Sequence, residues 1–331
     1  MAGQAPREAL RWLDGKPRLH ELMERYPKVW SEAGMELVAA LEGGRAQNMN
    51  ELVGRARATT ELWKCKIRKS HNNPKVIESA LPYLIKSRMS VLAMDKCFFA
   101  AATGKATGKV RFNQINGFII QKLLFSHHLT RKPVSLRWFR FWWRFVGQKR
   151  LLMPLVQPRG IYCFYSREVI AAIAQLIGAR SCLEIAAGDG TLARFLTAAG
   201  VNIKATDDYS WKHAIEYPEV VEQLGAKQAL EKYEPQVVIC SWPPPANTFE
   251  RDVFARKSVE FYMVIGSRYR FASGNWETYC SQTRFTVDCD PRLSSLVLPP
   301  ELESAVLLFR RNGQPHSDPT AHLTDDTPPK Q

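Results

Sequence analysis

The feature of this sequence that most restricts its fold is a glycine-rich turn between an apolar run and a helix. The segment Leu183–Leu192, LEIAAGDGTL, begins as a short buried strand, passes through Gly188 and Gly190, and continues as a helix that Gly200 ends. Glycines in such a turn let a ligand approach the backbone closely. The free N–H groups at the start of the helix can bind that ligand, so the segment predicts a binding site.

Strand-like and helix-like segments alternate from about residue 161 onward. Apolar helices are expected at 168–177 and 191–199, and buried strands at 181–186, 201–206, 237–240 and 261–265. Segments 285–287 and 305–309 are expected to form an antiparallel pair. This alternation predicts an α/β fold, a Rossmann-like, doubly wound and mostly parallel sheet with helices on both faces.

The chain before residue 160 has a different pattern. Apolar residues recur there at helical spacing, as in Leu19, Leu22, Tyr26 and Trp30. We therefore expect a helical, basic N-terminal domain over 1–160, which recognises or covers a substrate, and the α/β domain over 161–310. The polar, proline-containing end, residues 311–331, is expected to be a disordered tail.

The net charge of +14 is concentrated in one segment. Residues 64–160 hold 20 Lys and Arg but only two acidic residues, Glu78 and Asp95, and the rest of the chain is nearly balanced. A segment this one-sided suits single-stranded nucleic acid or an anionic surface. Aromatic side chains among its arginines, at Trp138, Trp142 and Trp143, could stack on bases or lie in a membrane interface. A helix packed between two domains explains the aromatic residues equally well.

Other functional classes are excluded by what the sequence lacks. No apolar run is long enough for a transmembrane helix, and the N-terminus lacks the pattern of a signal peptide, so we expect a cytoplasmic protein. The seven cysteines form no C-x-x-C pair. They are expected to be buried, reduced thiols, and no metal site is predicted.

The glycine turn fits two kinds of ligand. Gly188, Gly190 and Ala193 satisfy a dinucleotide fingerprint, with Asp207 19 residues after Gly188, so an NAD-dependent oxidoreductase is one hypothesis. The same stretch resembles the first motif of class I S-adenosylmethionine-dependent methyltransferases, in which an acid precedes alternating glycines. Glu184, Ala186, Gly188 and Gly190 match that motif, with Ala186 in place of the first glycine. The acid inside the strand favours the methyltransferase, because a pyrophosphate would repel it.

The resemblance implies a role for each matching residue, with S-adenosylmethionine as the cofactor. Glu184 would lie near the methionine amino group, and Asp207 would accept hydrogen bonds from the ribose hydroxyls. Asp208 is the alternative to Asp207. The family carries Asp-Ala after its third strand; here the segment VEQL, residues 221–224, is followed by Gly225-Ala226, so the backbone at Ala226 is expected to contact the adenine.

A polar and proline-rich segment follows the strand at 237–240. Ser241, Trp242 and Pro243 resemble the motif of amino methyltransferases, which implies methyl transfer to a nitrogen. A proline-rich loop that only closes the pocket is the alternative. Tyr165, Ser166 and Arg167 are candidates for contact with the methionine end. The incomplete motifs also allow a nucleic-acid-binding protein that keeps the fold without catalysis.

Overall fold

The computed structural model describes residues 6–42, 46–96, 114–212 and 214–313, and the chain divides into two compact units, 1–105 and 106–331. No helix among the described residues is long and apolar enough to cross a membrane. Most of the predicted tail, residues 314–331, lies outside the described residues. The two units are described separately.

The first unit is entirely helical in its described residues. Its helices are α1 (Pro6–Asp14), α2 (Leu19–Arg25), α3 (Pro27–Glu42), α4 (Ala46–Lys69) and α5 (Pro74–Lys96). Proline begins three of them, because the first helical position needs no N–H donor. Ile77, Ala80 and Leu84 of α5 are buried at helical spacing and pack with Ile67 of α4. The prediction of a helical N-terminal region is confirmed for this unit.

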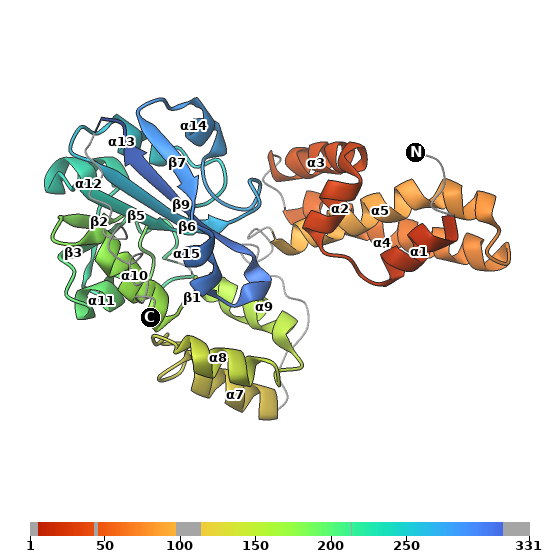
Figure 1. The fold of residues 1–331 in the computed structure, drawn as a ribbon, viewed down its shortest axis with the longest axis horizontal. Helices are drawn as coiled ribbons and strands as arrows, with labels where there is room; N and C mark the ends of the chain where they lie inside the picture. Colours follow the sequence, from red (N-terminus) through yellow and green to blue (C-terminus); the bar gives the residue numbers. More distant parts are fainter. Residues whose placement is uncertain (1–5, 43–45, 97–113, 213, 314–331) are drawn as a thin grey trace, which may run out of the picture. The chain divides into compact units, whose positions relative to one another are not determined.

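The second unit contains a seven-stranded sheet (Figure 1). Its strands are β2 (Cys182–Glu184), β3 (Ile203–Asp207), β4 (Val221–Gln223), β5 (Val237–Ser241), β6 (Phe261–Ser267), β7 (Phe285–Cys289) and β9 (Ser304–Arg311). They lie in the order β4-β3-β2-β5-β6-β9-β7, in which β9 pairs antiparallel with both β6 and β7 and the other pairs are parallel. The predicted α/β sheet and its antiparallel terminal pair are confirmed.

Helices cover both faces of this sheet (Figure 1). The helices α10 (Arg167–Ile177), α11 (Thr191–Ala198) and α15 (Pro291–Leu296) lie on one face. The helices α12 (Ala226–Tyr233), α13 (Glu250–Ala255) and α14 (Trp276–Ser281) lie on the other. The central strands β5 and β6 are buried almost throughout, as expected for strands covered on both faces. Val238, Tyr262 and Phe309 are fully buried in the core under the second group of helices.

The division between the units falls near residue 105 rather than at the predicted boundary of 160. The helices α7 (Gln114–Leu124), α8 (Leu136–Trp143) and α9 (Leu152–Val156) belong to the unit that contains the sheet. Their apolar side chains share one core with Phe164 of β1 (Phe164–Tyr165) and Leu298 of β8 (Val297–Leu298). The alternation of helices and strands starts near residue 161 because the strands begin there. The helices before it nevertheless pack in the core that they share with β1 and β8.

The cysteines among the described residues are unpaired, as expected. Cys163, Cys182 and Cys240 are buried, whereas Cys280 and Cys289 are exposed on the surface. The expectation of burial therefore holds for Cys163, Cys182 and Cys240 and is wrong for these two. Cys65 is half-buried, and Cys97 lies outside the described residues.

Candidate functional site

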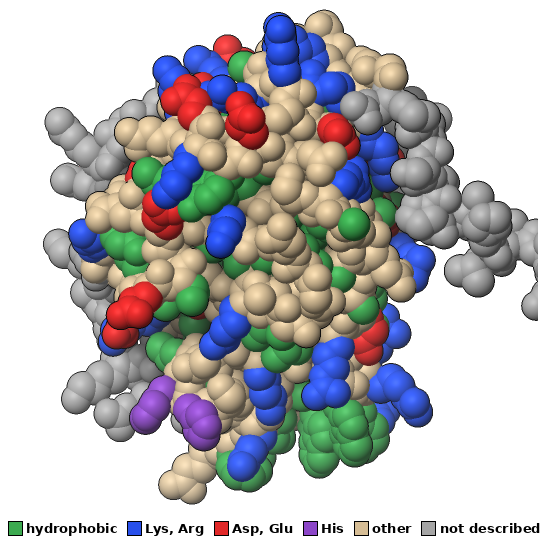
Figure 2. Space-filling model, turned by 90° about the vertical axis from the view of Figure 1, so that its left-hand side faces the viewer, with side chains coloured by type: hydrophobic (Ala, Val, Ile, Leu, Met, Phe, Trp, Pro, Cys, Tyr) green, Lys and Arg blue, Asp and Glu red, His purple; other side chains and the backbone are tan. Residues whose placement is uncertain are grey.

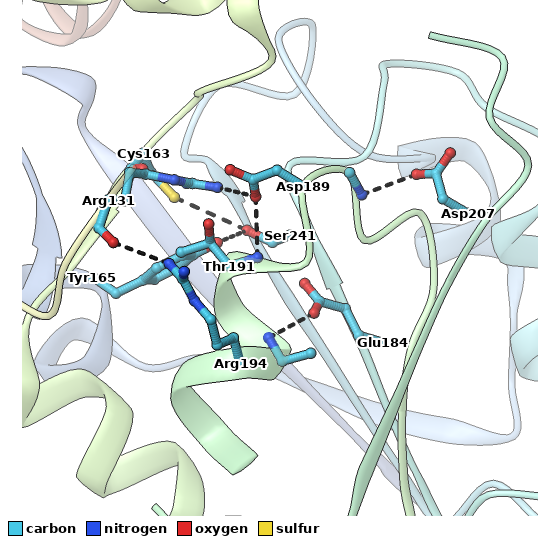
Figure 3. Close-up of polar contacts among 11 residues, drawn as sticks. Arg131, Cys163, Tyr165, Glu184, Asp189, Thr191, Arg194, Asp207 and Ser241 are labelled. Atoms are coloured by element: carbon cyan, nitrogen blue, oxygen red, sulfur yellow. Dashed lines mark hydrogen bonds and ion pairs between the residues drawn. The ribbon is translucent and has the colours of Figure 1, made fainter. Parts of the chain in front are cut away.

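The carboxyl ends of three parallel strands bring polar side chains together at one edge of the sheet (Figure 3). Glu184 ends β2, Asp207 ends β3 and Ser241 ends β5. β2 lies between β3 and β5. After β2 the chain adds β3 and β4 on one side of it, and then crosses to add β5 and β6 on the other side. Ligands of open α/β sheets bind at such a switch point, outside the carboxyl ends of the strands.

The turn after β2 has the tight geometry that its glycines predict. Gly188 and Gly190 have φ angles of 58° and 65°, and Ala186 also has a positive φ, of 49°. A Cβ atom on Gly190 would lie 2.6 Å from Val221 Cγ2, so no side chain fits at this position. The N–H of Ala187 donates to the Thr206 carbonyl at 3.0 Å, which holds the turn against β3.

Glu184 is almost completely buried under the first turn of α11. Its Oε2 accepts a hydrogen bond from the Ala193 N–H at 2.9 Å. Burial raises the pKa of Glu184 to about 8, and the nearby carboxylates of Asp189 and Asp207 act in the same direction. A carboxyl group in this state favours a cationic neighbour, because a positive charge would stabilise its ionised form.

Asp207 fastens the glycine turn to the end of β3. Its Oδ2 accepts from the Gly188 N–H at 3.0 Å and its Oδ1 from the Tyr209 N–H at 2.9 Å. Burial raises the pKa of Asp207 in spite of these two donors. Asp208, the alternative, is exposed and accepts only from the Ser210 N–H among the described contacts. The geometry therefore favours Asp207 over Asp208 as the residue facing the site.

The structure adds a buried arginine that the sequence did not indicate. Arg131 is 7% exposed, and it donates to the Cys163 carbonyl at 2.8 Å and to Asp189 Oδ1 at 2.5 Å. Its Nε is buried and has no partner among the described residues. Although burial raises the pKa of Asp189, the charge of Arg131 and hydrogen bonds from Thr191 bring it below its ordinary value. Arg131 precedes the glycine turn by more than 50 residues, so no local pattern could have revealed it.

Tyr165 connects the segment before α10 with the end of β5. Its hydroxyl lies 2.6 Å from Ser241 Oγ, and the Arg131 guanidinium lies 5.6 Å from the centre of its ring. The sequence-predicted neighbours of Tyr165 have other roles. Ser166 is fully buried and accepts from the Val169 N–H at 2.9 Å, so it caps α10, whereas Arg167 is exposed. Of these three candidates, the structure brings Tyr165 to the site.

Trp242 and Pro243 form a fixed wall beyond Ser241. Trp242 is 7% exposed and its backbone adopts a φ of 59°, with its N–H donating to the Ile265 carbonyl at 2.6 Å. The Pro243 carbonyl accepts from the Gly274 N–H at 3.0 Å. With so little of its surface exposed, Trp242 shapes the wall and offers no open face for stacking.

A buried carboxylate holds the loop that follows this wall. Glu250 is fully buried and accepts hydrogen bonds from the hydroxyls of Tyr262 and Tyr279. It also accepts from Asn247 Nδ2 at 2.6 Å and from the Asn275 N–H at 2.9 Å. Four donors on one carboxylate make the loop after β5 rigid.

The predicted adenine contact lies next to Asp207. Ala226 is the first residue of α12 and follows Gly225 at the N-cap. The Leu224 N–H donates to the Asp207 carbonyl at 2.9 Å, which ties this turn to the end of β3. The backbone N–H groups at the start of α12 are therefore oriented near the same edge of the sheet. Among the described residues, no three His, Cys, Asp or Glu side chains gather as metal ligands.

Comparison with known proteins gives distant structural similarities. No protein-family model and no curated protein matches the chain. A 23S rRNA methyltransferase, ErmE, is 19% identical over 45% of this chain and 70% of its own, with a TM-score of 0.28. The magnesium protoporphyrin IX methyltransferase of Synechocystis is 11% identical over 52% and 90%, with a TM-score of 0.32. Human N-acetylserotonin methyltransferase is 12% identical over 52% and 55%, with a TM-score of 0.31.

The order of the strands defines the fold class. Numbered along the chain from β2, the strands lie in the order 3-2-1-4-5-7-6, and the last strand is the antiparallel one. A dinucleotide-binding sheet of the dehydrogenases has the order 3-2-1-4-5-6. This sheet differs from that order in an antiparallel last strand inserted beside the edge strand, so the second unit is a Rossmann-like, doubly wound and mostly parallel sheet.

Replacement of Arg131 tests whether this buried cation holds the site together. Arg131→Met leaves the Cys163 carbonyl and Asp189 without their donor, and we expect it to lower the free energy of unfolding by about 2–3 kcal/mol. The value is below that of a fully buried pair because the Asp189 side chain is 28% exposed. Urea denaturation measures the change. Arg137→Met, on the exposed face of α8, is the control and should change stability by less than about 0.5 kcal/mol. Equal effects of the two substitutions would contradict the role of Arg131.

Proposed function

We propose that this chain is an S-adenosylmethionine-dependent methyltransferase. The observation that carries the proposal is the pair of buried carboxylates, Glu184 and Asp207, on either side of the glycine turn at the switch point of the sheet. A raised pKa at Glu184 suits a cationic ligand, which S-adenosylmethionine is and a dinucleotide is not. The strand order supports the same choice over an NAD-dependent oxidoreductase.

The residues at the edge of the sheet suit the parts of this cofactor. Glu184 would balance the ammonium of the methionine part, and the buried Arg131 would favour its carboxylate. Gly188 and Gly190, with Ala186, would let the backbone pass close to the ligand. Asp207 would accept from the ribose hydroxyls through the lone pairs that Gly188 and Tyr209 do not use.

The remaining part of the cofactor is the adenine. Ala226 would contact it through the backbone, because the family's acidic residue at the preceding position is Gly225 here. The N-terminal end of α12, tied to Asp207 through Leu224, supports this assignment.

The methyl-transfer site is proposed at Ser241, Trp242 and Pro243, with a nitrogen as the acceptor. Bound cofactor would supply an electrophilic methyl group. The Ser241 hydroxyl, fixed by Tyr165 at 2.6 Å, would accept a hydrogen bond from the acceptor and direct its lone pair. Trp242 and Pro243 are held by backbone hydrogen bonds to Ile265 and Gly274, which would keep the geometry fixed in advance.

Replacement of Asp207 tests the proposed cofactor site. Asp207→Ala removes the proposed charged hydrogen bonds to the ribose, so affinity for S-adenosylmethionine should fall about ten- to a hundredfold. Isothermal titration calorimetry measures it, with circular dichroism to verify the fold. Asp208→Ala is the matched control and should bind as the wild type does. An unchanged dissociation constant in folded Asp207→Ala, or tighter binding of NAD than of S-adenosylmethionine, would overturn the proposal.

The raised pKa of Glu184 gives a pH dependence with a definite sign. The ionised form binds the ammonium better, so affinity should weaken as the pH falls below about 8, by up to about tenfold per pH unit. Glu184→Gln keeps an acceptor for the Ala193 N–H but does not titrate, so its affinity should be lower at pH 8 and less dependent on pH. Calorimetric titrations from about pH 6 to 8 compare the two proteins. Identical pH profiles would remove Glu184 from the site.

A structure with S-adenosylhomocysteine tests the methyl-transfer site. The sulfur should lie close to Ser241, Trp242 or Pro243, because transfer needs an approach of about 3–3.5 Å between the reacting atoms. A sulfur more than about 10 Å from all three would exclude them, since no substrate on that wall could then reach the methyl group. Cofactor bound at the glycine turn in that case would leave the methyltransferase proposal intact and move only the acceptor site.

A further inference from the structure

The outer face of α7 and α8 is apolar and cationic at the same time. The sequence left open whether the aromatic residues among the arginines of 136–146 are exposed or packed inside. Leu136, Phe139 and Trp143 are indeed buried at helical spacing. The other aromatic side chains are exposed: Trp138 at 62%, Phe141 at 43%, Trp142 at 41% and Phe145 at 57%. The alternative of a packed helix therefore holds for Phe139 and Trp143 and does not hold for these four rings.

The exposed side of α8 is divided into two stripes. At 3.6 residues per turn, the buried residues define an inner line, and the exposed aromatic residues lie opposite to it. The arginines occupy one flank of this aromatic ridge, between it and the buried line: Arg137, Arg140 and Arg144. The helix thus presents an apolar ridge with a cationic border.

Helix α7 extends the same surface on the other flank. Ile115 and Phe118 are 73% and 65% exposed. A cavity of about 360 Å³ lies between the helices, with an apolar wall and a cationic border. The wall includes Phe118, Trp138 and Trp142, and the border includes Lys122, Lys132 and Arg167. In Figure 2, hydrophobic side chains gather among Lys and Arg at the lower end of the molecule, where α7 and α8 lie.

The segment that contains α7 and α8 carries no acidic side chain. No acidic residue occurs from Lys96 to Arg167. Two carboxylates accept hydrogen bonds from α8, one at its first residue and one at its buried side. Glu168 accepts from the Leu136 N–H at 3.2 Å, and Glu301 accepts from the indole of the buried Trp143 at 3.0 Å. They fix the helix and leave its outer arginines for another anion.

The packing of the rings distinguishes between the possible anions. Phe141 makes edge contacts with Trp138, Trp142 and Phe145 at centroid distances of 5.3–6.4 Å. The Arg144 guanidinium covers Phe141 and Phe145 at 4.6 and 5.2 Å. Bases of single-stranded nucleic acid need open ring faces on which to stack. These rings instead pack edge to face on one another and beneath Arg144, so part of each contact is taken up within the cluster and the cluster is mainly an apolar projection.

We propose that the face formed by α7 and α8 docks on the surface of an anionic phospholipid membrane. The aromatic ridge and Ile115 enter the boundary between headgroups and acyl chains, as apolar side chains of interfacial helices do. The arginines on one flank and Lys122, Lys132 and Arg167 on the other contact the lipid phosphates. The apolar groups of this face match the acyl-chain boundary of the membrane, and its cationic groups match the layer of lipid phosphates. The inference does not depend on the proposed enzymatic activity.

Flotation of the full-length protein with vesicles tests this surface. Vesicles of phosphatidylcholine and phosphatidylglycerol should bind it, whereas vesicles of phosphatidylcholine alone should bind it weakly. Phe141→Ser with Phe145→Ser should lower the partition coefficient by more than about tenfold, because two apolar anchors are lost. Arg137→Gln and Arg140→Gln should each lower it by about fivefold.

Exposed apolar residues elsewhere on the same unit give a matched control. Val220→Ser with Val287→Ser, at positions 69% and 50% exposed, should bind as the wild type does. Circular dichroism verifies that each variant is folded. Absence of binding to anionic vesicles, equal binding to neutral vesicles, or an unaffected aromatic variant would overturn the proposal. So would tight binding of a uridine-rich single-stranded RNA by a protein that no vesicle retains.

Discussion

The candidate site depends on the attachment of the turn between β2 and α11 to the end of β3. The Gly188 N–H bonds to Asp207, the Ala187 N–H bonds to the Thr206 carbonyl, and Gly190 lies against Val221. The same carboxylate that closes the turn also faces the space outside the strands. The hydrogen bond between Gly188 and Asp207 thus fixes both the backbone of the turn and the carboxylate that faces the ligand. The loop therefore needs little rearrangement to receive a ligand.

The electrostatics of the site follow from burial. Glu184 is removed from water with a single backbone donor, Ala193, so its carboxyl group holds its proton more tightly than usual. Arg131 and Asp189 balance each other a short distance away. A zwitterionic ligand such as the methionine part of S-adenosylmethionine would complement both centres at once, which adds to the support that Glu184 and Asp207 give the proposed function.

The helices before the sheet link this site to the rest of the second unit. Arg131 lies between α7 and α8, whose inner sides share a core with β1 and β8. Its guanidinium reaches the glycine turn, while the outer sides of the same two helices carry the aromatic ridge. One compact group of helices therefore contributes a buried cation to the site and an apolar, cationic face to the surface.

The sequence by itself determined the elements that repeat a local pattern. Apolar runs fixed the strands, and the spacing of Glu184, Gly188, Gly190 and Asp207 placed the binding edge, because backbone geometry and burial act over a few residues. Tertiary structure alone decided the position of Arg131, the contact between Tyr165 and Ser241, and the unit to which residues 114–160 belong. It also decided which rings of α8 are exposed. These features depend on which surfaces pack together between residues far apart in the chain. A helix with aromatic residues on several sides does not show in its sequence which of those sides the core will bury.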